Sequence, residues 1–454
     1  MAKMEDIVSL CKRRGFIWQG SDVYGGMAGT WDFGPLGVAL KRRIMNTWWN
    51  YWVEGRDDMY GVDAAIIMNP KTWEASGHTA TFADPLVECN ECHGRFRADK
   101  LVEGANESIS TEEFKAKNAK CPTCGKVNWS DIRKFNMMFQ THVGPVDDDS
   151  SIAYLRPETA QGIFVNYLNV QKTGRMKLPF GIAQIGKAFR NEIVARQFIF
   201  RMREFEQMEM QFFVKPGTEL QWFETWKQAR MKWHQNLGFG AENYRFHDHD
   251  KLAHYANAAT DIEFHMPFGF KEVEGIHSRT NFDLSQHAKY SGKKIEYFDP
   301  DTNESYTPYV IETSIGVDRM FLSVLCHAYE EQLLPDGQIR TVLHLPAALA
   351  PVKLAIFPLT KKDGLPEKAQ EIFNDLRFYF NCKYEEKDQI GKRYRRMDAI
   401  GCPYCITVDQ QTLEDNTVTL RDRDTMEQTR VAISELQQIV DEKVTITSLL
   451  KKLA

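Results

Sequence analysis

Two short segments separated by a loop constrain the fold of this chain more than any other feature. The first, AFRNE, covers residues 188–192, and the second, RMREF, covers residues 201–205. Both favour antiparallel strands, and because alternate residues of a strand share a face, Arg190 and Glu192 are expected to point the same way. Phe205, Gln207 and Glu209 are likewise expected to share one face. A guanidinium binds phosphate, a carboxylate accepts from an exocyclic amine, and an aromatic ring such as Phe205 stacks on a base. The two segments therefore predict a nucleotide site on paired strands.

Length and composition limit the class of protein. The 454 residues suffice for two or three domains, each with its own core. Acidic residues slightly outnumber basic ones, 62 against 57, so any contact with nucleic acid must come from local basic patches. A run of about 18 apolar residues is absent, and the N-terminus lacks the apolar core of a signal peptide. We therefore expect a soluble, cytoplasmic protein that does not contact a membrane.

Apolar patterns in the first half predict a helix that leads into a strand. The helix is expected over residues 35–53, where apolar residues recur at helical spacing, and the strand over residues 62–68, before Pro70. Further strands are expected within residues 150–330. The region near 215–300, rich in Trp, His and Tyr, is assigned no elements from sequence.

The second half predicts a smaller unit behind a linker. Residues 345–351 are uncharged and bounded by prolines, which is typical of a linker. Beyond it, strand and helix patterns alternate, which favours a small α/β domain with a largely parallel core. We accordingly expect domains at residues 1–345 and 351–454, and a mixed α/β (α+β) fold overall.

Four cysteines in two C-x-x-C pairs predict a metal site inside an insertion at residues 86–134. Each pair can turn two sulfurs toward one point, and structural zinc takes four such ligands in a tetrahedron: Cys89, Cys92, Cys121 and Cys124. A redox motif or plain free thiols are the alternatives, but a redox motif does not explain two pairs. A third pair, Cys402 and Cys405, has no second pair nearby and is interpreted as buried cysteines beside a strand.

The pattern F-R-x-E, loop, R-x-x-x-F resembles motif 2 of the class II aminoacyl-tRNA synthetases. Three further segments, RPETAQG at 156–162, SRTNFDL at 278–284 and IETSIGVDR at 311–319, look like those of the dimeric glycyl-tRNA synthetases, a class IIa family, in the same order. The resemblance continues through the C-terminal segments at 391–396 and 417–427. It covers nearly the whole chain.

The resemblance implies a fold, a reaction and partners. The fold would be the antiparallel class II sheet with flanking helices, a zinc-knuckle insertion and a C-terminal α/β anticodon-binding domain. The reaction would join glycine to ATP, with Mg²⁺, and then pass glycine to the 3′ end of tRNA(Gly). Residues 35–70 resemble motif 1, which implies a homodimer, although an ordinary helix packed on a sheet explains that local pattern equally well.

The resemblance also implies roles in ATP binding and catalysis. Arg190 would bridge the α-phosphate and the substrate carboxylate, and Arg201 would reach the γ-phosphate of a bent ATP. Phe205 and Arg319 would sandwich the adenine, and Glu192 would read its amino group. Arg190 and Arg319 are the expected catalytic residues. The class more often shows G-x-G-x-R where this chain has aspartate in place of the second glycine.

Glycine offers no side chain, so its selection must rest on its ammonium group and on the exclusion of anything larger. By resemblance, Glu158, Glu209 and Glu312 would surround the ammonium. Ser314 would complete the floor of the site, and Arg279 would add a cation.

The C-terminal domain holds one dense run of cations with an aromatic ring, a mixture that suits phosphates and unstacked bases. The run consists of Lys392, Arg393, Tyr394, Arg395 and Arg396. It is the expected tRNA contact, and a charged helix start at the surface is the alternative.

Two other functions remain open from sequence alone. One is a class IIa synthetase for threonine, proline, histidine or serine. The other is a catalytically inactive, synthetase-like accessory protein that only binds nucleic acid, although such a protein has no physical need for the phosphate-binding arginines.

Overall fold

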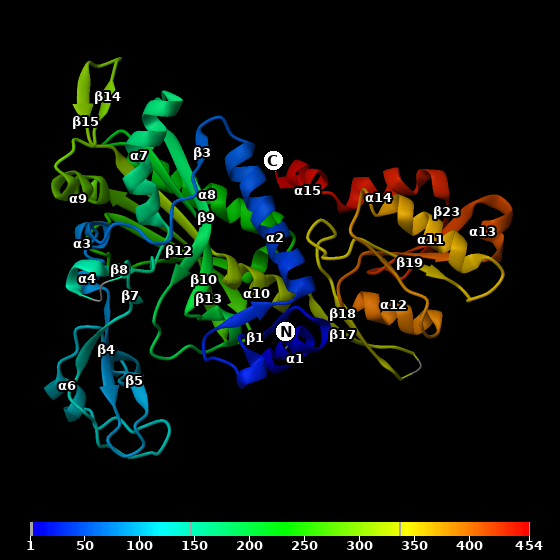
Figure 1. The fold of residues 1–454 in the computed structure, drawn as a ribbon, viewed down its shortest axis with the longest axis horizontal. Helices are drawn as coiled ribbons and strands as arrows, with labels where there is room; N and C mark the ends of the chain where they lie inside the picture. Colours follow the sequence, from blue (N-terminus) through cyan, green and yellow to red (C-terminus); the bar gives the residue numbers. More distant parts are fainter. Residues whose placement is uncertain (1–2, 146–147, 336, 454) are drawn as a thin grey trace.

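The computed structural model describes residues 3–145, 148–335 and 337–453. A seven-stranded sheet in the order β11-β12-β13-β16-β10-β9-β3 forms the centre of the N-terminal unit (Figure 1). Neighbouring strands are antiparallel, except that β3 runs parallel to β9. In the same order the strands span Tyr244–Asp248, Ala258–Met266, Gly269–Thr280, Tyr309–Gly316, Glu204–Val214, Phe180–Phe189 and Met59–Gly61. The antiparallel pairing of β9 with β10 agrees with the sequence prediction.

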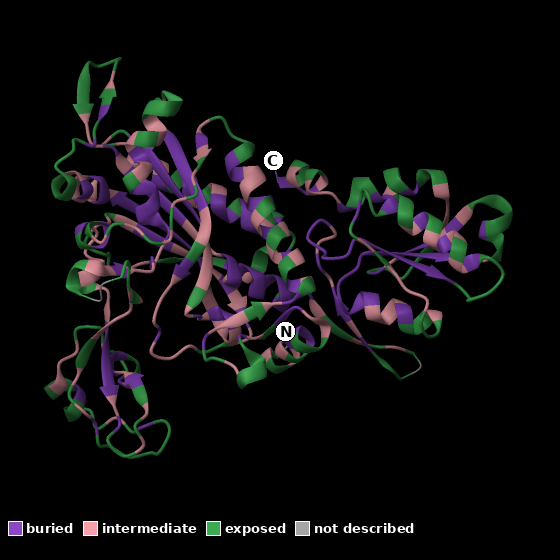
Figure 2. Ribbon diagram, viewed as in Figure 1, coloured by how far each residue is buried: buried purple, intermediate pink, exposed green. Residues whose placement is uncertain are grey.

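Alternation along β10 separates a buried face of the sheet from a polar one. Met208, Met210 and Phe212 enter the main core, whereas Gln207 and Glu209 face the other way. Helices α2, α8 and α10 pack on the core side, and α7, with α9 beside it, lies on the polar side. Figure 2 shows buried residues concentrated along the strands of the central sheet. These helices span Pro35–Trp49, Glu219–Asn236, Val317–Ala328, Ala160–Gly174 and Phe282–Ser291.

The predicted helix of residues 35–53 is present, but the strand predicted at 62–68 is wrong. Helix α2 continues as a π-helical turn over Asn50–Glu54, and the strand forms earlier, as β3. Beyond Val62 the ladder to β9 stops, because the side chain of Arg156 donates to the carbonyl of Ala64 at 2.7 Å in place of a backbone partner. The chain then alternates between exposed and half-buried residues along the end of the sheet.

The predicted insertion forms a module that projects from the N-terminal unit (Figure 1). Its three-stranded antiparallel sheet consists of β4 (Ala83–Glu88), β5 (Arg95–Arg97) and β6 (Arg133–Asn136), with short helices α5 (Ala98–Leu101) and α6 (Thr111–Ala116). Phe96, Phe114 and Trp129 form a small core of its own. The module is therefore joined to the body mainly through β4 and β6.

Short elements complete the N-terminal unit. They are α1 (Met4–Arg14), β1 (Ile17–Gln19), β2 (Trp31–Phe33), α3 (Lys71–Ala75), α4 (His78–Thr81), β7 (Gln140–His142), β8 (Ile152–Tyr154), β14 (Tyr297–Asp299), β15 (Glu304–Tyr306), β17 (Tyr329–Leu333) and β18 (Ile339–Leu343).

The C-terminal unit has a five-stranded sheet in the order β20-β19-β21-β22-β23. The first three strands are parallel, as the alternation of strands and helices predicts, whereas β22 and β23 form an antiparallel hairpin that the sequence did not predict. The strands in this order span Cys382–Tyr384, Leu354–Pro358, Tyr404–Val408, Thr417–Asp422 and Gln428–Ala432. The helices are α11 (Leu365–Leu376), α12 (Ile390–Asp398), α13 (Gln410–Asp415), α14 (Leu436–Val444) and α15 (Ile446–Leu453).

The two units are joined by more than a linker. Residues 345–351 are largely buried, and Arg43 of α2 donates to the carbonyls of Ala350 and Pro351 at 2.9 and 3.1 Å. Helix α15 returns to the main core, where Leu449 and Leu453 are buried. The segment predicted as a linker is therefore a packed junction. Across the described residues, the helices are too short or too polar to span a membrane.

Candidate active site

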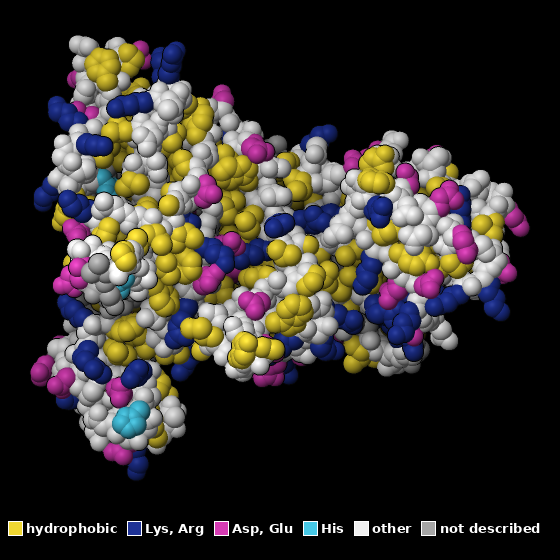
Figure 3. Space-filling view, viewed as in Figure 1, with side chains coloured by type: hydrophobic (Ala, Val, Ile, Leu, Met, Phe, Trp, Pro, Cys, Tyr) yellow, Lys and Arg dark blue, Asp and Glu magenta, His cyan; other side chains and the backbone are white. Residues whose placement is uncertain are grey.

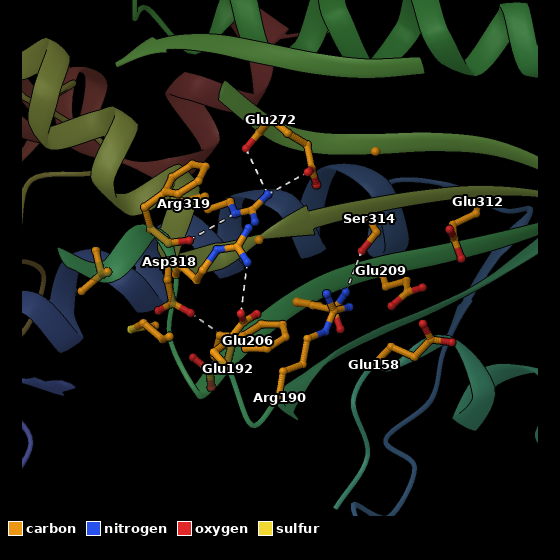
Figure 4. A pocket seen from close by; sticks show the side chains of 18 of the residues that line it. Glu158, Arg190, Glu192, Glu206, Glu209, Glu272, Glu312, Ser314, Asp318 and Arg319 are labelled. Carbon is orange, nitrogen blue, oxygen red and sulfur yellow. Dashed lines mark hydrogen bonds and ion pairs between the residues drawn. The ribbon is translucent and has the colours of Figure 1, made fainter. Parts of the chain in front are cut away.

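One pocket on the polar face of β10, β16 and β13 contains every residue that the sequence assigned to ATP or glycine (Figure 4). These residues are Glu158, Arg190, Glu192, Arg201, Phe205, Glu209, Arg279, Glu312, Ser314 and Arg319. The pocket has two ends. Glu158, Glu209, Glu312 and Ser314 gather at one, and Arg319 lies at the other with Glu272 and Asp318.

Strand pairing brings the carboxylates of the acidic end together. Glu209 of β10 lies opposite Ser314 of β16, and Gln211 lies opposite Glu312. The side-chain amide of Gln211 donates to Glu209 at 3.0 Å and to Glu312 at 2.7 Å. Thr159 also donates its hydroxyl hydrogen to Glu209. Neutral donors therefore hold two buried carboxylates side by side.

Arg279 supplies the counter-charge for Glu312. Its guanidinium lies 3.1 Å from Glu312 and makes a two-pronged contact with Asp283 at 2.8 and 2.9 Å. The Tyr255 ring lies 4.0 Å from the guanidinium, and His277 approaches Glu312 at 3.1 Å from the other side. In this structure Arg279 thus orients a carboxylate from within the wall of the pocket.

The three carboxylates titrate differently because their neighbours differ. Burial opposes ionisation of Glu158, but the neighbouring charge of His78 prevails and lowers its pKa to about 2. Burial also acts on Glu312, and Arg279 overcomes it and lowers the pKa of Glu312. Burial together with the charges of Glu312 and Glu158 raises the pKa of Glu209 well above its usual range. The acidic end is therefore electronegative, with one carboxyl inclined to hold a proton, and it suits a cationic group.

The nucleotide end is framed by the loop between β9 and β10. Arg190 donates to the carbonyl of Pro157 at 3.1 Å, and its guanidinium lies 5.4 Å from the Phe82 ring and 5.3 Å from the Phe205 ring. Arg201 pairs with Glu192 at 3.0 Å. The two arginines can therefore bind phosphates, and the aromatic ring of Phe205 can contact a base.

Arg190 and Glu192 do not share a strand face as predicted, although both side chains line the pocket. Strand β9 ends at Phe189, and the backbone then turns, so that the amide of Glu192 donates to the carbonyl of Arg190 at 2.7 Å. Face sharing along a strand therefore does not apply to this pair.

Arg319 lies in the first turn of α10, next to β16. It pairs with Glu272 at 2.9 Å, and the Phe200 ring lies 4.5 Å from its guanidinium. Phe200, which the sequence analysis missed, is thus the ring nearest to Arg319 here. Phe205 packs on Arg190 instead.

Asp318, the departure from G-x-G-x-R, has a clear structural task. It accepts from Lys41 of α2 at 2.9 Å and from the backbone amide of Glu206 at 2.9 Å. It therefore ties the start of β10 to the helix of the motif 1 segment. The substitution in the motif was visible from sequence, but its partners were not.

Glu272 was also not predicted, because no strand was expected near residues 215–300, and a bulge in β13 breaks the alternation there. Glu272 lies opposite Glu263 of β12 and Glu274 lies opposite Ile262, so Val273 is an extra residue. Glu272 faces the pocket, whereas Glu274 is fully buried against Arg230 of α8 at 2.5 Å.

The four predicted cysteines lie together in the insertion. All four sulfurs are within 4.8 Å of one another, and two of the pairs are 3.6 Å apart. The two loops close in the same way. The backbone amide of His93 donates to the carbonyl of Cys89, and that of Gly125 donates to the carbonyl of Cys121, both at 2.8 Å. Both donors have positive φ, which turns the chain back on itself. Cys402 and Cys405 are buried, as interpreted.

The cationic run of the C-terminal unit forms much of α12. Arg393 is buried and donates to the carbonyls of Pro358 and Asp388 at 2.6 and 3.1 Å. Tyr394 bonds Thr407 at 2.5 Å. Lys392 is exposed and Arg395 is partly exposed. The surface available to a partner therefore comes from only part of the run.

Known families match both units. The family described as "tRNA synthetase class II core domain (G, H, P, S and T)" matches residues 139–329, and "Anticodon binding domain" matches residues 353–443. Two solved structures from Cryptosporidium parvum share the fold. A structure described as the RNA binding domain of threonyl-tRNA synthetase has a TM-score of 0.67 at 17% identity, over 96% of this chain and 98% of that one. A prolyl-tRNA synthetase has a TM-score of 0.64 at 13% identity, over 98% and 76%. The fold and the core match define a class II aminoacyl-tRNA synthetase.

Curated relatives narrow the class. A glycine–tRNA ligase of Treponema denticola is 54% identical over 95% of each chain. Those of Clostridium kluyveri and Geobacillus kaustophilus are each 52% identical, over 97% of this chain and 98% or 99% of theirs. The chain belongs to the glycine–tRNA ligase family. The resemblance seen in the sequence is confirmed, and the two alternative functions find no support among these relatives.

Proposed function

We propose that the pocket joins glycine to ATP, forming glycyl-adenylate and pyrophosphate, and that the chain then transfers glycine to the 3′ end of tRNA(Gly). This function is supported mainly by one observation: a single pocket holds the glutamates at one end and the arginines at the other. Exchange of pyrophosphate into ATP that requires glycine, followed by charging of tRNA(Gly), tests it.

At the acidic end, Glu158, Glu209 and Glu312 would receive the ammonium of glycine. Ser314, which accepts from Gln207 at 3.1 Å, would form the floor. Arg279 keeps Glu312 ionised and in place rather than meeting the substrate directly. A larger amino acid would press its side chain against packed neighbours, and overpacking opposes binding.

At the nucleotide end, Arg190 would join the α-phosphate to the carboxylate of glycine, and Arg201 would leave Glu192 to reach the γ-phosphate. Glu192 would then be available to the amino group of adenine. The base would lie between Phe205 and Arg319. Catalysis would consist of in-line positioning and stabilisation of phosphate charge, without a covalent enzyme intermediate.

Mg²⁺, which class II synthetases ordinarily use with ATP, would neutralise phosphate charge. The carboxylate of Glu272 at the nucleotide end offers the oxygen ligand that this ion prefers.

We propose that the cysteine cluster holds structural zinc. Zinc–sulfur bonds of about 2.3 Å in a tetrahedron place sulfurs about 3.8 Å apart. The Cys89–Cys124 and Cys92–Cys121 separations, both 3.6 Å, fit this geometry, and four thiolates would leave no position for a reacting water.

Elemental analysis of purified protein should find about one zinc per chain. Cys121→Ser should lose most of it, because a hydroxyl is a poor zinc ligand and the remaining three sulfurs leave the tetrahedron incomplete. Cys382→Ser, which alters a cysteine outside the cluster, is the matched control and should keep its metal. Metal-free wild-type protein, or unchanged zinc in Cys121→Ser, would refute the assignment.

We also propose a homodimer through residues 35–70. Strand β3 ends the central sheet, and the chain beyond it leaves Ile67 about half exposed, at 49%. Sedimentation at low micromolar concentration should give twice the chain mass of 52.5 kDa. A fully active monomer at that concentration would exclude this proposal.

We propose that residues 1–345 form the catalytic domain and residues 351–454 the anticodon-binding domain, with α12 as a tRNA contact. On the face shown in Figure 3, basic and acidic side chains are interspersed over the C-terminal unit, so local contacts must serve. Lys392 is the exposed member of the run, and Arg395, which donates to Gln338, is partly exposed beside it. Arg396 is bound to Glu385 and Asp388. Arg393 and Tyr394 would act mainly by shaping the helix.

Replacing Lys392 and Arg395 together by alanine should weaken tRNA charging. The slope of log tRNA affinity against log salt concentration should become shallower by about two, one for each lost phosphate contact. Adenylate formation without tRNA should not change. Replacing the exposed Lys451 and Lys452 of α15 is the charge-matched control. Equal tRNA charging by Lys392/Arg395 variant and parent at every salt concentration would show that α12 is not the contact.

A further inference from the structure

Helix α4, at the root of the insertion, and Phe82 after it contact residues from both ends of the pocket. His78 begins this four-residue helix and Phe82 follows it. Figure 1 shows α4 where the projecting module meets the body. Neither residue is assigned a role by the sequence analysis or by the proposed function.

His78 reaches the acidic end. Its Nε2 lies 3.4 Å from Glu158, and its Nδ1 lies 2.8 Å from the hydroxyl of Ser76. The rings of Trp73 and Phe82 lie 5.6 and 5.3 Å from the imidazole. The imidazole is therefore fixed on three sides and presents one nitrogen to Glu158.

Phe82 reaches the nucleotide end. Its ring lies 5.4 Å from the Arg190 guanidinium, and the Phe205 ring lies 5.3 Å from the same group. Its carbonyl accepts from Met137 at 3.0 Å, and the carbonyl of Met137 accepts from Asn191 at 2.7 Å. Phe82 thus contacts the side chain of Arg190 directly and is linked through Met137 to the backbone of Asn191, the next residue.

The strands of the insertion hold α4 in this position. Asn136, the last residue of β6, donates its amide to the carbonyls of His78 and Thr79 at 3.2 and 3.1 Å. It pairs with Ala83 at the start of β4. The orientation of α4 is therefore set by the two strands that carry the insertion.

We propose that His78 and Phe82 are positioning residues, one for each end of the pocket. His78 holds the Glu158 carboxylate toward the ammonium of glycine, and Phe82 holds Arg190 toward the α-phosphate. The inference rests on the proposed roles of Glu158 and Arg190. It assigns the root of the insertion to the active site, independently of any contact between the insertion and tRNA.

Steady-state pyrophosphate exchange by the full chain separates the two roles. His78→Ala should raise the KM for glycine about tenfold, because Glu158 loses a charge-assisted partner, and leave the KM for ATP within about twofold. Phe82→Ala should do the reverse, raising the KM for ATP about tenfold and lowering kcat, because Arg190 loses an aromatic partner. His78→Gln and Phe82→Tyr should recover most of each loss. Ala80→Ser, an exposed change on the same helix, is the control.

A double-variant cycle tests whether His78 acts through Glu158. Glu158→Gln should raise the KM for glycine, and adding His78→Ala should then cost no more than about twofold. An unchanged KM in Glu158→Gln would contradict the proposed glycine site itself. A raised KM in Glu158→Gln with none in His78→Ala would overturn only the inference.

Zinc content and unfolding temperature exclude an indirect effect. Both should match the parent in His78→Gln and Phe82→Tyr. Equal shifts of both KM values in His78→Ala and Phe82→Ala, without recovery by the conservative variants, would overturn the inference and leave α4 a purely structural helix.

Discussion

Arg190→Ala should slow glycyl-adenylate formation at least about 100-fold, because a preorganised cation aimed at charge that develops in the transition state contributes about this much. Arg190 is already held by Pro157 and two rings, so little reorganisation is needed when phosphate arrives. Pyrophosphate exchange at saturating ATP and glycine measures the effect, and the KM for ATP should rise as well.

Arg196→Ala provides the control for this variant. Arg196 is an exposed arginine of the same loop and does not line the pocket. Its replacement should leave exchange without tRNA nearly unchanged. A loss below about threefold in Arg190→Ala, or ~0.7 kcal/mol in the barrier, would contradict the role given to Arg190.

Arg279→Met should destabilise the fold by about 3–5 kcal/mol, because it leaves two buried carboxylates without their cation. Asp283 and Glu312 both depend on this guanidinium, and all three side chains are buried. Loss of Arg279 also removes the main influence that lowers the pKa of Glu312, so binding of glycine should weaken at neutral pH. Denaturant unfolding and the KM for glycine measure the two effects.

The matched change is Arg245→Met on β11. Arg245 pairs with Glu263 at 2.7 Å, but its side chain is 53% exposed. Solvent screens such a pair, so the cost should stay below about 1 kcal/mol. Equal losses of stability in the two variants would show that burial of the Arg279 ion pairs does not increase the cost of removing the arginine.

The sequence predicted the chemistry of the pocket better than its geometry. Alternation placed Glu209 on the polar face of β10 correctly, since β10 is a regular strand over that stretch. The same rule failed at Arg190 and Glu192, where the strand has ended. No strand was predicted around Glu272, and the bulge at Val273 breaks the alternation there as well. Single-residue departures from regular structure leave little trace in a pattern of residue types.

Side chains that donate hydrogen bonds to backbone carbonyls were also not predicted from the sequence. Arg393 looks like a surface cation in the sequence but is buried on carbonyl groups, and Arg156 replaces the predicted strand pairing near Ala64. The same holds for His78 and Phe82, which precede the insertion in the sequence and contact Glu158 and Arg190 of the pocket in the structure. Their partners are separated from them by many residues, and only the folded chain brings them together.

Pyrophosphate exchange without tRNA, run with one amino acid at a time, tests the central claim most directly. Glycine should support exchange, and alanine should be at least about 100-fold less effective in kcat/KM, because its methyl group meets a packed floor. Serine, threonine and proline should be weaker still. Absence of glycine-dependent exchange by folded protein, or a higher kcat/KM with another amino acid, would contradict the account.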